Sequence, residues 1–394
     1  MAQLPSNIPT APGRWRELAS KKRVESKTVF ELPDFNSGSK IEDKQFLTLH
    51  VLWKSRNSTE FKPQNWGFSG FKGLEQLPKD NHLDSNKNWK DYTEMSGERT
   101  KGSPHLGTFD MLWEYQRIVD GLRVNGPELN KVRDQDYLYS PSAAAKARKD
   151  GLGGLTEEME VVSLNDDSED SETTPQDVMH QLFSPVAPGD TDEYGSFNNV
   201  DDEQIVNTAL ILLLQGICLR APQVEKTEWT LQRKAFDFAT NTADNESIKL
   251  FQARTDGHLR IAMEEGKESR SLAILEVKAK MRNAAEPYMQ ESAQMAAWIH
   301  AEPDVRNKSD TYRRVMICQD HREIYLNIAE YNWDYLLYIR DGVKPANGPS
   351  FLTMNQFGPF IPDRTGHMRA LGSIFLALTQ QLEKEAINGE PCRW

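Results

Sequence analysis

Cysteine is scarce in this chain of 394 residues, and its three copies, Cys218, Cys318 and Cys392, lie far apart in the sequence. No Cys-x-x-Cys pair is present, so the sequence predicts neither a disulfide scaffold nor a structural zinc site. The eight histidines are scattered and form no His-Glu-x-x-His motif. This sparse use of cysteine fits a reducing compartment, so we expect an intracellular protein of the nucleus or cytoplasm.

Long apolar runs are also missing. The longest purely aliphatic run, from Ala209 to Leu214, is far shorter than the ~20 residues needed to span a bilayer. The opening sequence, MAQLPSNIPTAPGRWRELASKKR, lacks the apolar segment of a secretory signal. We therefore expect no membrane partner.

Three common enzyme signatures are absent. The sequence contains no GxxxxGK[ST] loop, no GxGxxG loop and no GxSxG turn. Nucleotide-binding enzymes of these types and hydrolases with a nucleophile elbow are therefore not predicted.

The negative charge of the protein is concentrated in one segment. The formal net charge is -12, but residues 151–203 alone contain fifteen Asp and Glu residues and no Lys or Arg, which leaves +3 for the rest. Like charges mixed with Ser, Pro and Gly bury too little apolar surface to offset the entropy lost on folding. We therefore predict an acidic disordered linker over residues 151–200. It could be a plain spacer, compete with nucleic acid for a basic groove, or be phosphorylated.

This linker separates two parts of different character. Residues 1–150 contain two candidate strands within 28–56 and a candidate helix over 107–124, which is too little to predict a fold. They could pack on the C-terminal part or act separately, and a protein partner could bind them.

The C-terminal part, residues 201–394, is more regular. Its predicted elements are a helix over 201–219, strands within 228–239, 248–263 and 271–280, a helix over 286–301, a hairpin over 311–328 that turns at Gln319–Arg322, and a helix over 365–387.

Three residues of the C-terminal part have the chemistry of a phosphodiesterase site. Asp256 lies at an Asp-Gly turn between strand segments, and Glu276 and Lys278 lie in the next strand, SLAILEVKAK. Side-chain alternation places Glu276 and Lys278 on one face, and an antiparallel neighbour can bring Asp256 close to them. Carboxylates suit a hard ion such as Mg²⁺, with Mn²⁺ as an alternative, and such an ion activates water and polarises a phosphoryl oxygen. The lysine could orient that water or stabilise the added charge.

Each of these features also has an ordinary structural explanation. Glu-x-Lys occurs five times in the sequence, and a same-face ion pair on a half-exposed strand needs no catalytic role. Asp256-Gly257 is by itself a common turn. The copy at Glu276 differs from the others because it lies in an apolar strand, after an Asp-Gly turn and before an amphipathic helix.

Together these features resemble the PD-(D/E)XK nuclease superfamily, which has the restriction-endonuclease-like fold, and in particular uncharacterised fungal proteins with a nuclease-like domain. The similar stretches are DEQIVNTALILLL, EWTLQRKAF, ARTDGHLRI, LAILEVKAK and MQESAQMAAWI, between residues 202 and 299. The resemblance implies an α/β (α+β) fold for residues 201–394, with a mixed central sheet flanked by helices.

The resemblance also implies roles for single residues. Asp256 and Glu276 would bind Mg²⁺, with Glu203 as a possible outer acidic ligand. Lys278 would be the catalytic lysine, and Gln294 would correspond to the helix glutamine of RecB-type members.

The match departs from the family in two respects. Thr255 stands where the motif usually has proline, and the sheet segments carry no excess of positive charge. Local basic clusters remain, at Arg233 and Lys234, at Arg254 and Arg260, and from Lys278 to Arg282. Two functions therefore stay open: a Mg²⁺-dependent nuclease acting on DNA or RNA, and a catalytically inactive nuclease-fold protein that acts as a binding or regulatory scaffold.

Overall fold

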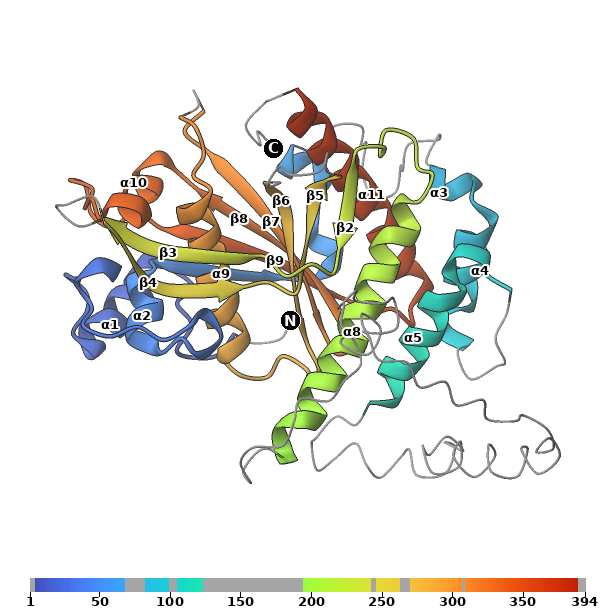
Figure 1. Ribbon diagram of the computed structural model, residues 1–394, viewed down its shortest axis with the longest axis horizontal. Helices are drawn as coiled ribbons and strands as arrows, with labels where there is room; N and C mark the ends of the chain where they lie inside the picture. The colour runs from blue at the N-terminus through green and yellow to red at the C-terminus, as the bar shows by residue number, and fades with distance from the viewer. Residues whose placement is uncertain are drawn as a thin grey trace, which may run out of the picture. The chain divides into compact units, whose positions relative to one another are not determined.

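Figure 1 shows the computed structural model of the chain. It describes residues 4–67, 82–98, 105–122, 194–241, 246–262, 270–306 and 309–388, without the side chains of 194–202 and 241. The chain divides into one unit of Met1–Arg123 and Asn198–Trp394 and a second unit of Val124–Phe197, of which only the start of a helix is described. Most of the predicted acidic linker, residues 151–193, therefore lies outside the described residues.

A seven-stranded mixed sheet forms the centre of the larger unit. The strands, in their spatial order, are β1 (Val51–Arg56), β9 (Leu352–Phe360), β8 (Glu323–Tyr331), β7 (Tyr312–Asp320), β6 (Ser271–Lys278), β5 (Gly257–Ile261) and β2 (Thr227–Thr230). The pairs β1–β9 and β6–β7 are parallel, and the other neighbours are antiparallel. The central strands are apolar on both faces because helices cover both sides.

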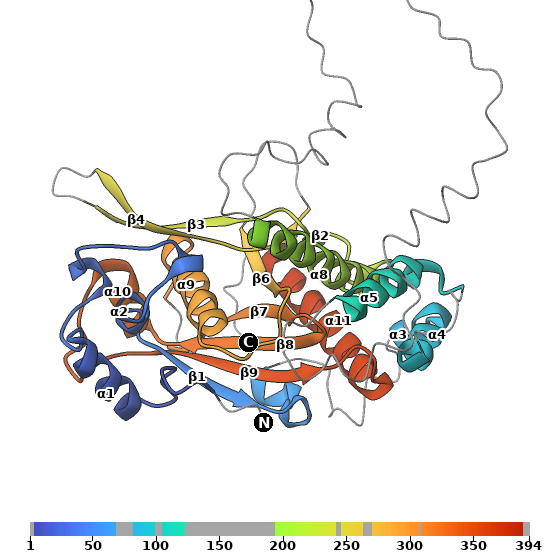
Figure 2. The same cartoon turned by 90° about the horizontal axis from the view of Figure 1, so that it is seen from below.

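The helices form two layers, one on each face of the sheet (Figures 1 and 2). The first layer consists of α3 (His82–Ser85), α4 (Lys87–Met95), α5 (Asp110–Gly121), α8 (Tyr194–Cys218) and α11 (Thr365–Ile387). The second consists of α1 (Pro12–Lys22), α2 (Asp43–Thr48), α9 (Glu286–Ala301) and α10 (Trp333–Asp341). Short 3-10 turns lie at Val29–Glu31, Gly38–Lys40, Ser58–Glu60, Pro63–Trp66, Ser96–Glu98 and Gly107–Phe109. Side chains of β6 point alternately to the two faces of the sheet and so contribute to the hydrophobic core on each face. Leu275 faces the first layer of helices and Ile274 the second.

A bent β-hairpin connects the sheet to the second layer. Strands β3 (Ala235–Asn241) and β4 (Ser247–Arg254) form a separate two-stranded sheet. They continue the β2–β5 pair beyond a bend at residues 231–234 and 255–256. Past the bend the hairpin packs on α9, where Phe236 stacks on Trp298 and Phe238 stacks on His300. The bend therefore lies where the two sheets diverge.

The described residues before 123 complete the same core. Strand β1 extends the sheet through β9, and the indole Nε1 of Trp53 donates a hydrogen bond to Oγ of Ser292 on α9. The hydroxyls of Tyr335 and Tyr338 on α10 donate to the carbonyl oxygens of Leu49 and Thr48. Of the two arrangements left open by the sequence, the structure has these residues packed on the C-terminal part.

Most long elements are confirmed, but several boundaries are not. The helices over 286–301 and 365–387 and the hairpin at Gln319–Arg322 are present. The single strand predicted over 228–239 is wrong because the chain bends between β2 and β3. The first stretch of the 28–56 prediction contains the turn Val29–Glu31 rather than a strand.

Strand β9 and helix α10 were not predicted. Strand β9 contains polar Asn355 and Gln356 and the Gly358-Pro359 pair, which interrupt a strand pattern in the sequence. The expected α/β class, with a large mixed sheet flanked by helices, is present.

Candidate functional site

Asp256 lies at the bend of the hairpin and is held by its neighbours. Its amide donates to the carbonyl oxygen of Leu275 at 3.0 Å, and its Oδ2 accepts from the amide of Val277 at 3.0 Å. The side-chain amide of Asn207, on α8, donates to the carbonyl oxygen of Asp256 at 2.9 Å. Glycine is required next, because a Cβ atom on Gly257 would lie 2.5 Å from the carbonyl oxygen of Thr230.

Glu276 is buried in β6, with its carboxylate directed toward α9. Its residue exposure is 2%, and its Oε1 accepts from Nζ of Lys278 at 2.6 Å. The side-chain amides of Gln290 and Gln294, one helical turn apart on α9, donate to Oε1 and Oε2, each at 2.5 Å. Gln294 also donates to the carbonyl oxygen of Arg254. The strand and the helix thus hold both carboxylate oxygens.

Lys278 links this buried carboxylate to a more exposed one. Its Nζ lies 3.8 Å from Oε1 of Glu203, on α8, in addition to its bond to Glu276. The side chains of Lys278 and Glu203 are 22% and 33% exposed, so this side of the cluster is open to solvent. The structure therefore brings Lys278 together with both Glu276 and Glu203.

The acidic side chains influence one another strongly. Burial raises the pKa of Glu276 to about 8, and the charge of Asp256 adds to this increase. Burial also raises the pKa of Glu203, against the lowering effect of Lys278. For Lys278, burial acts to lower the pKa, but Glu276 and Glu203 together outweigh it and raise the pKa. The lysine therefore stays charged between two carboxyl groups that are costly to ionise.

A second cation lies at the bend. Nη2 of Arg233, in the segment between β2 and β3, lies 3.2 Å from Oδ1 of Asp256. The Arg233 side chain is 51% exposed, whereas that of Asp256 is 12% exposed. Asp256 therefore has one oxygen on a buried amide and the other on a half-exposed guanidinium.

Three of these contacts were not predicted. The sequence indicated a role for Gln294 but none for Gln290, although residues four apart share a helix face. Arg233 stood only among the local basic residues, and Asn207 had no predicted role. The contacts of Arg233 and Asn207 depend on the bend and on α8, which no local pattern reveals.

The basic clusters are only partly available to a ligand. Arg282 is a buried side chain, 1% exposed, paired with Asp320 at 2.5 Å and with Glu291. Arg260 forms an ion pair with Glu228 at 2.7 Å. The idea that Arg282 contributes to a basic surface is therefore wrong, because its charge is neutralised inside the protein.

Arg282 and its partners Asp320 and Glu291 form a buried ion-pair group beside the candidate site. Its guanidinium lies 4.8 Å from the ring centres of both Tyr288 and Tyr325. Asp320, at the end of β7, is the register partner of Lys278 at the end of β6. This group therefore fixes the strand end that carries Lys278.

The donor set suits a hard divalent ion in kind, since Glu203, Asp256 and Glu276 supply carboxylate oxygens. Two buried amide oxygens, Oδ1 of Asn207 and Oε1 of Gln294, have no hydrogen-bond partner among the described residues, although each amide touches this group through its nitrogen. Within the described ranges, however, no group of three or more His, Cys, Asp or Glu side chains is arranged to hold a metal ion. The oxygen ligands are therefore of the right kind for a divalent ion, but cationic side chains of the protein already pair with these carboxylates.

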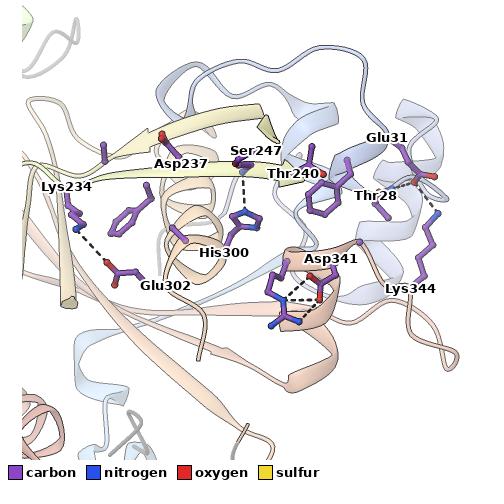
Figure 3. A pocket seen from close by; sticks show the side chains of 17 residues that line it. Thr28, Glu31, Lys234, Asp237, Thr240, Ser247, His300, Glu302, Asp341 and Lys344 are labelled. Atoms are coloured by element: carbon purple, nitrogen blue, oxygen red, sulfur yellow. Dashed lines mark hydrogen bonds and ion pairs between the residues drawn. The ribbon is translucent and has the colours of Figure 1, made fainter. Parts of the chain in front are cut away.

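A groove of about 1250 Å³ lies apart from these residues (Figure 3). Strand β3, the end of α9, the segment 28–31 and the end of α10 form its walls. Four of its charged side chains pair with one another: Lys344 with Glu31 at 3.2 Å, and Arg340 with Asp341 at 2.6 Å. The acidic cluster, which consists of Glu203, Asp256 and Glu276, does not line this groove. We therefore place the candidate site at the hairpin bend.

Comparison of the sequence with models of known protein families and with curated proteins finds no match. Among the helices in the described part of the chain, none combines the length and the apolar character needed to cross a membrane.

Proposed function

We propose that this protein is a metal-dependent phosphodiesterase that hydrolyses DNA or RNA, with Mg²⁺ or Mn²⁺ as its metal ion. One observation carries the proposal: Asp256 is bonded to the amide of Val277, the residue between Glu276 and Lys278, and the paired Lys278 is partly open to solvent. We also assign the surrounding strands β5, β6 and β7 and helices α8 and α9 to a restriction-endonuclease-like core.

The protein groups have distinct parts in this reaction. Asp256 and Glu276, with Glu203 farther out, would hold a divalent ion, which when bound supplies a polarised phosphoryl oxygen and an activated water. Val277 fixes Asp256 through its amide. The Lys278 ammonium, held by Glu276, can orient an attacking water or stabilise negative charge on the phosphate.

Exposed cations near the site favour a polyanionic substrate. Arg233 touches Asp256, Arg254 is two residues before Asp256, and Lys280 is two residues after Lys278; all three cations are exposed. Lysine and arginine at such positions suit the repeated phosphates of a nucleic acid backbone. A polynucleotide is therefore the substrate that we favour.

A non-catalytic scaffold is the second candidate. It is favoured by the fact that the carboxylate oxygens of Asp256 and Glu276 are all engaged by protein donors. In that case Lys278 and Gln294 would serve to neutralise buried acid, and the protein would bind a partner without cleaving it.

Cleavage assays separate the two candidates. End-labelled single-stranded and double-stranded DNA and RNA are incubated with the full chain and with Mg²⁺, Mn²⁺ or EDTA. We expect metal-dependent cleavage that falls by about 100-fold or more in Lys278→Gln. The matched control is Lys249→Gln, which removes an exposed strand lysine paired with Asp237 and should cleave normally. Equal cleavage by wild type and Lys278→Gln, or none by wild type, contradicts the enzymatic function.

A further inference from the structure

We infer that Arg233 is an internal counter-cation that occupies Asp256 until a divalent ion binds, and that it then contacts a phosphate of the substrate. This inference rests on the proposed function and adds a residue that controls both metal binding and substrate binding at the same site.

The two oxygens of Asp256 differ in how firmly they are held. Oδ2 accepts from the buried amide of Val277 at 3.0 Å, a bond between two parts of the folded sheet. Oδ1 instead faces Nη2 of Arg233 at 3.2 Å. An incoming ion can take Oδ1 by displacing a side chain, whereas Oδ2 is fixed by the backbone of β6.

Arg233 is the cation of the cluster that can leave. Its side chain is 51% exposed, and it lies in the bend segment outside β2 and β3. Half-exposed ion pairs contribute little stability, so breaking this one is easy. Lys278 is less free, because it is 22% exposed and bonded to buried Glu276 at 2.6 Å.

The charges of the cluster favour such an exchange. Glu203, Asp256 and Glu276 are faced by two cations, Lys278 and Arg233, and both cations also act on Glu203. A divalent ion on the same carboxylates would repel the nearest guanidinium. Release of Arg233 to solvent removes this repulsion without disturbing the buried pair.

A displaced Arg233 remains tethered next to the reacting centre. Its planar guanidinium can bind two phosphate oxygens at once, which a lysine cannot match. An ion held by Asp256 brings the substrate phosphate close to the position that the guanidinium leaves. The same side chain therefore competes with the metal and binds the phosphate.

Metal binding without substrate is the first measurement. Calorimetric titration with Mn²⁺ compares the full-length wild type with Arg233→Gln. The control is Arg369→Gln, which removes a half-exposed arginine that pairs with Glu94 at 3.0 Å and belongs to α11, away from the site. We expect Arg233→Gln to bind Mn²⁺ about three- to tenfold more tightly, because a nearby positive charge is lost. Arg369→Gln should match the wild type.

Cleavage at saturating Mn²⁺ is the second measurement. Arg233→Gln should raise KM several-fold with a smaller change in kcat, and Arg233→Lys should keep wild-type Mn²⁺ affinity while raising KM. Mn²⁺ affinity that is unchanged or weaker in Arg233→Gln overturns the inference even if the wild type is a nuclease. Mn²⁺ binding with the expected tightening but no cleavage overturns the phosphate contact and the proposed function together. No Mn²⁺ binding by either protein overturns both proposals.

Discussion

Nζ of Lys278 lies 2.6 Å from Oε1 of Glu276, although the two residues belong to the same strand. The contact exists because side chains two apart project from one face of a strand. It joins a buried carboxyl group to a cation that is partly open to solvent. Removing either residue therefore changes both the charge and the stability of the cluster.

Mn²⁺ should stabilise the wild-type protein, and Glu276→Ala should abolish this effect. A ligand that binds only the folded state at 100 times its Kd adds about 2.7 kcal/mol, so Tm should rise by several degrees. Differential scanning fluorimetry with Mn²⁺ or EDTA measures the shift. Glu228→Ala removes a glutamate that pairs with Arg260 across the β2–β5 strands and should respond like wild type. A full Mn²⁺ response in Glu276→Ala would refute the site.

The Mn²⁺-induced stabilisation should increase with pH. Because burial raises the pKa of Glu276 to about 8, this carboxyl group holds a proton at neutral pH that a metal ion has to displace. The rise in Tm at a fixed Mn²⁺ concentration should therefore be larger at pH 8.5 than at pH 6.5. A stabilisation that is the same at both pH values contradicts a role for Glu276 in binding the ion.

Acid should weaken the fold through His50. Burial lowers the pKa of this histidine to about 4 in the folded protein, against 6.5 normally. Its ring stacks on Tyr338 at 4.1 Å, and its Nδ1 lies 3.2 Å from the carbonyl oxygen of Ser350. The unfolded chain binds a proton more readily, so stability that is complete above pH 6.5 is lost as the pH falls toward 4.

The loss attributable to His50 is up to about 3 kcal/mol. His50→Asn should reduce the difference in unfolding free energy between pH 7 and pH 4.5, measured by urea denaturation. Asparagine suits this position because the backbone of residue 50 is left-handed, with φ 52°. An unchanged pH dependence in the variant would show that other groups cause the acid sensitivity.

Gly257→Ala should destabilise the hairpin. The added Cβ would lie 2.5 Å from a backbone oxygen of Thr230, so β2 and β5 must move apart. We expect a loss of about 1–3 kcal/mol in urea denaturation, together with weaker Mn²⁺ binding. Gly13→Ala is the control, because nothing lies within 4 Å of the Cβ that it would add. Equal stability of the two variants would mean that the bend tolerates a side chain.

The sequence predicts the parts of the site that depend on local periodicity. Strand alternation is enough to place Glu276 and Lys278 together, and helix periodicity would have been enough to place Gln290 beside Gln294. The position of Arg233 could not be predicted, because the strand pattern of 228–239 gives no sign of the bend that turns this side chain toward Asp256.

Burial of charge is equally hidden from the sequence. Arg282 follows a lysine-rich strand end, so the local sequence predicts a surface cation. In the structure it is buried against Asp320 of β7 and Glu291 of α9. Only the folded chain brings these three together, so local composition gives the wrong environment. The same holds for β9, whose polar residues are buried by neighbours distant in the sequence.

The bend has a mechanical consequence, since the hairpin β3–β4 and the acidic cluster share the segments 231–234 and 255–256. Lys234 accepts from the amide of Thr255 through its carbonyl oxygen, which ties the two segments together at 3.0 Å. A molecule that pulls the hairpin away from α9 would therefore act on both segments that flank the site, including the one that contains Asp256. A force on the β3–β4 hairpin would thus reach Asp256, the carboxylate on which the proposed chemistry depends.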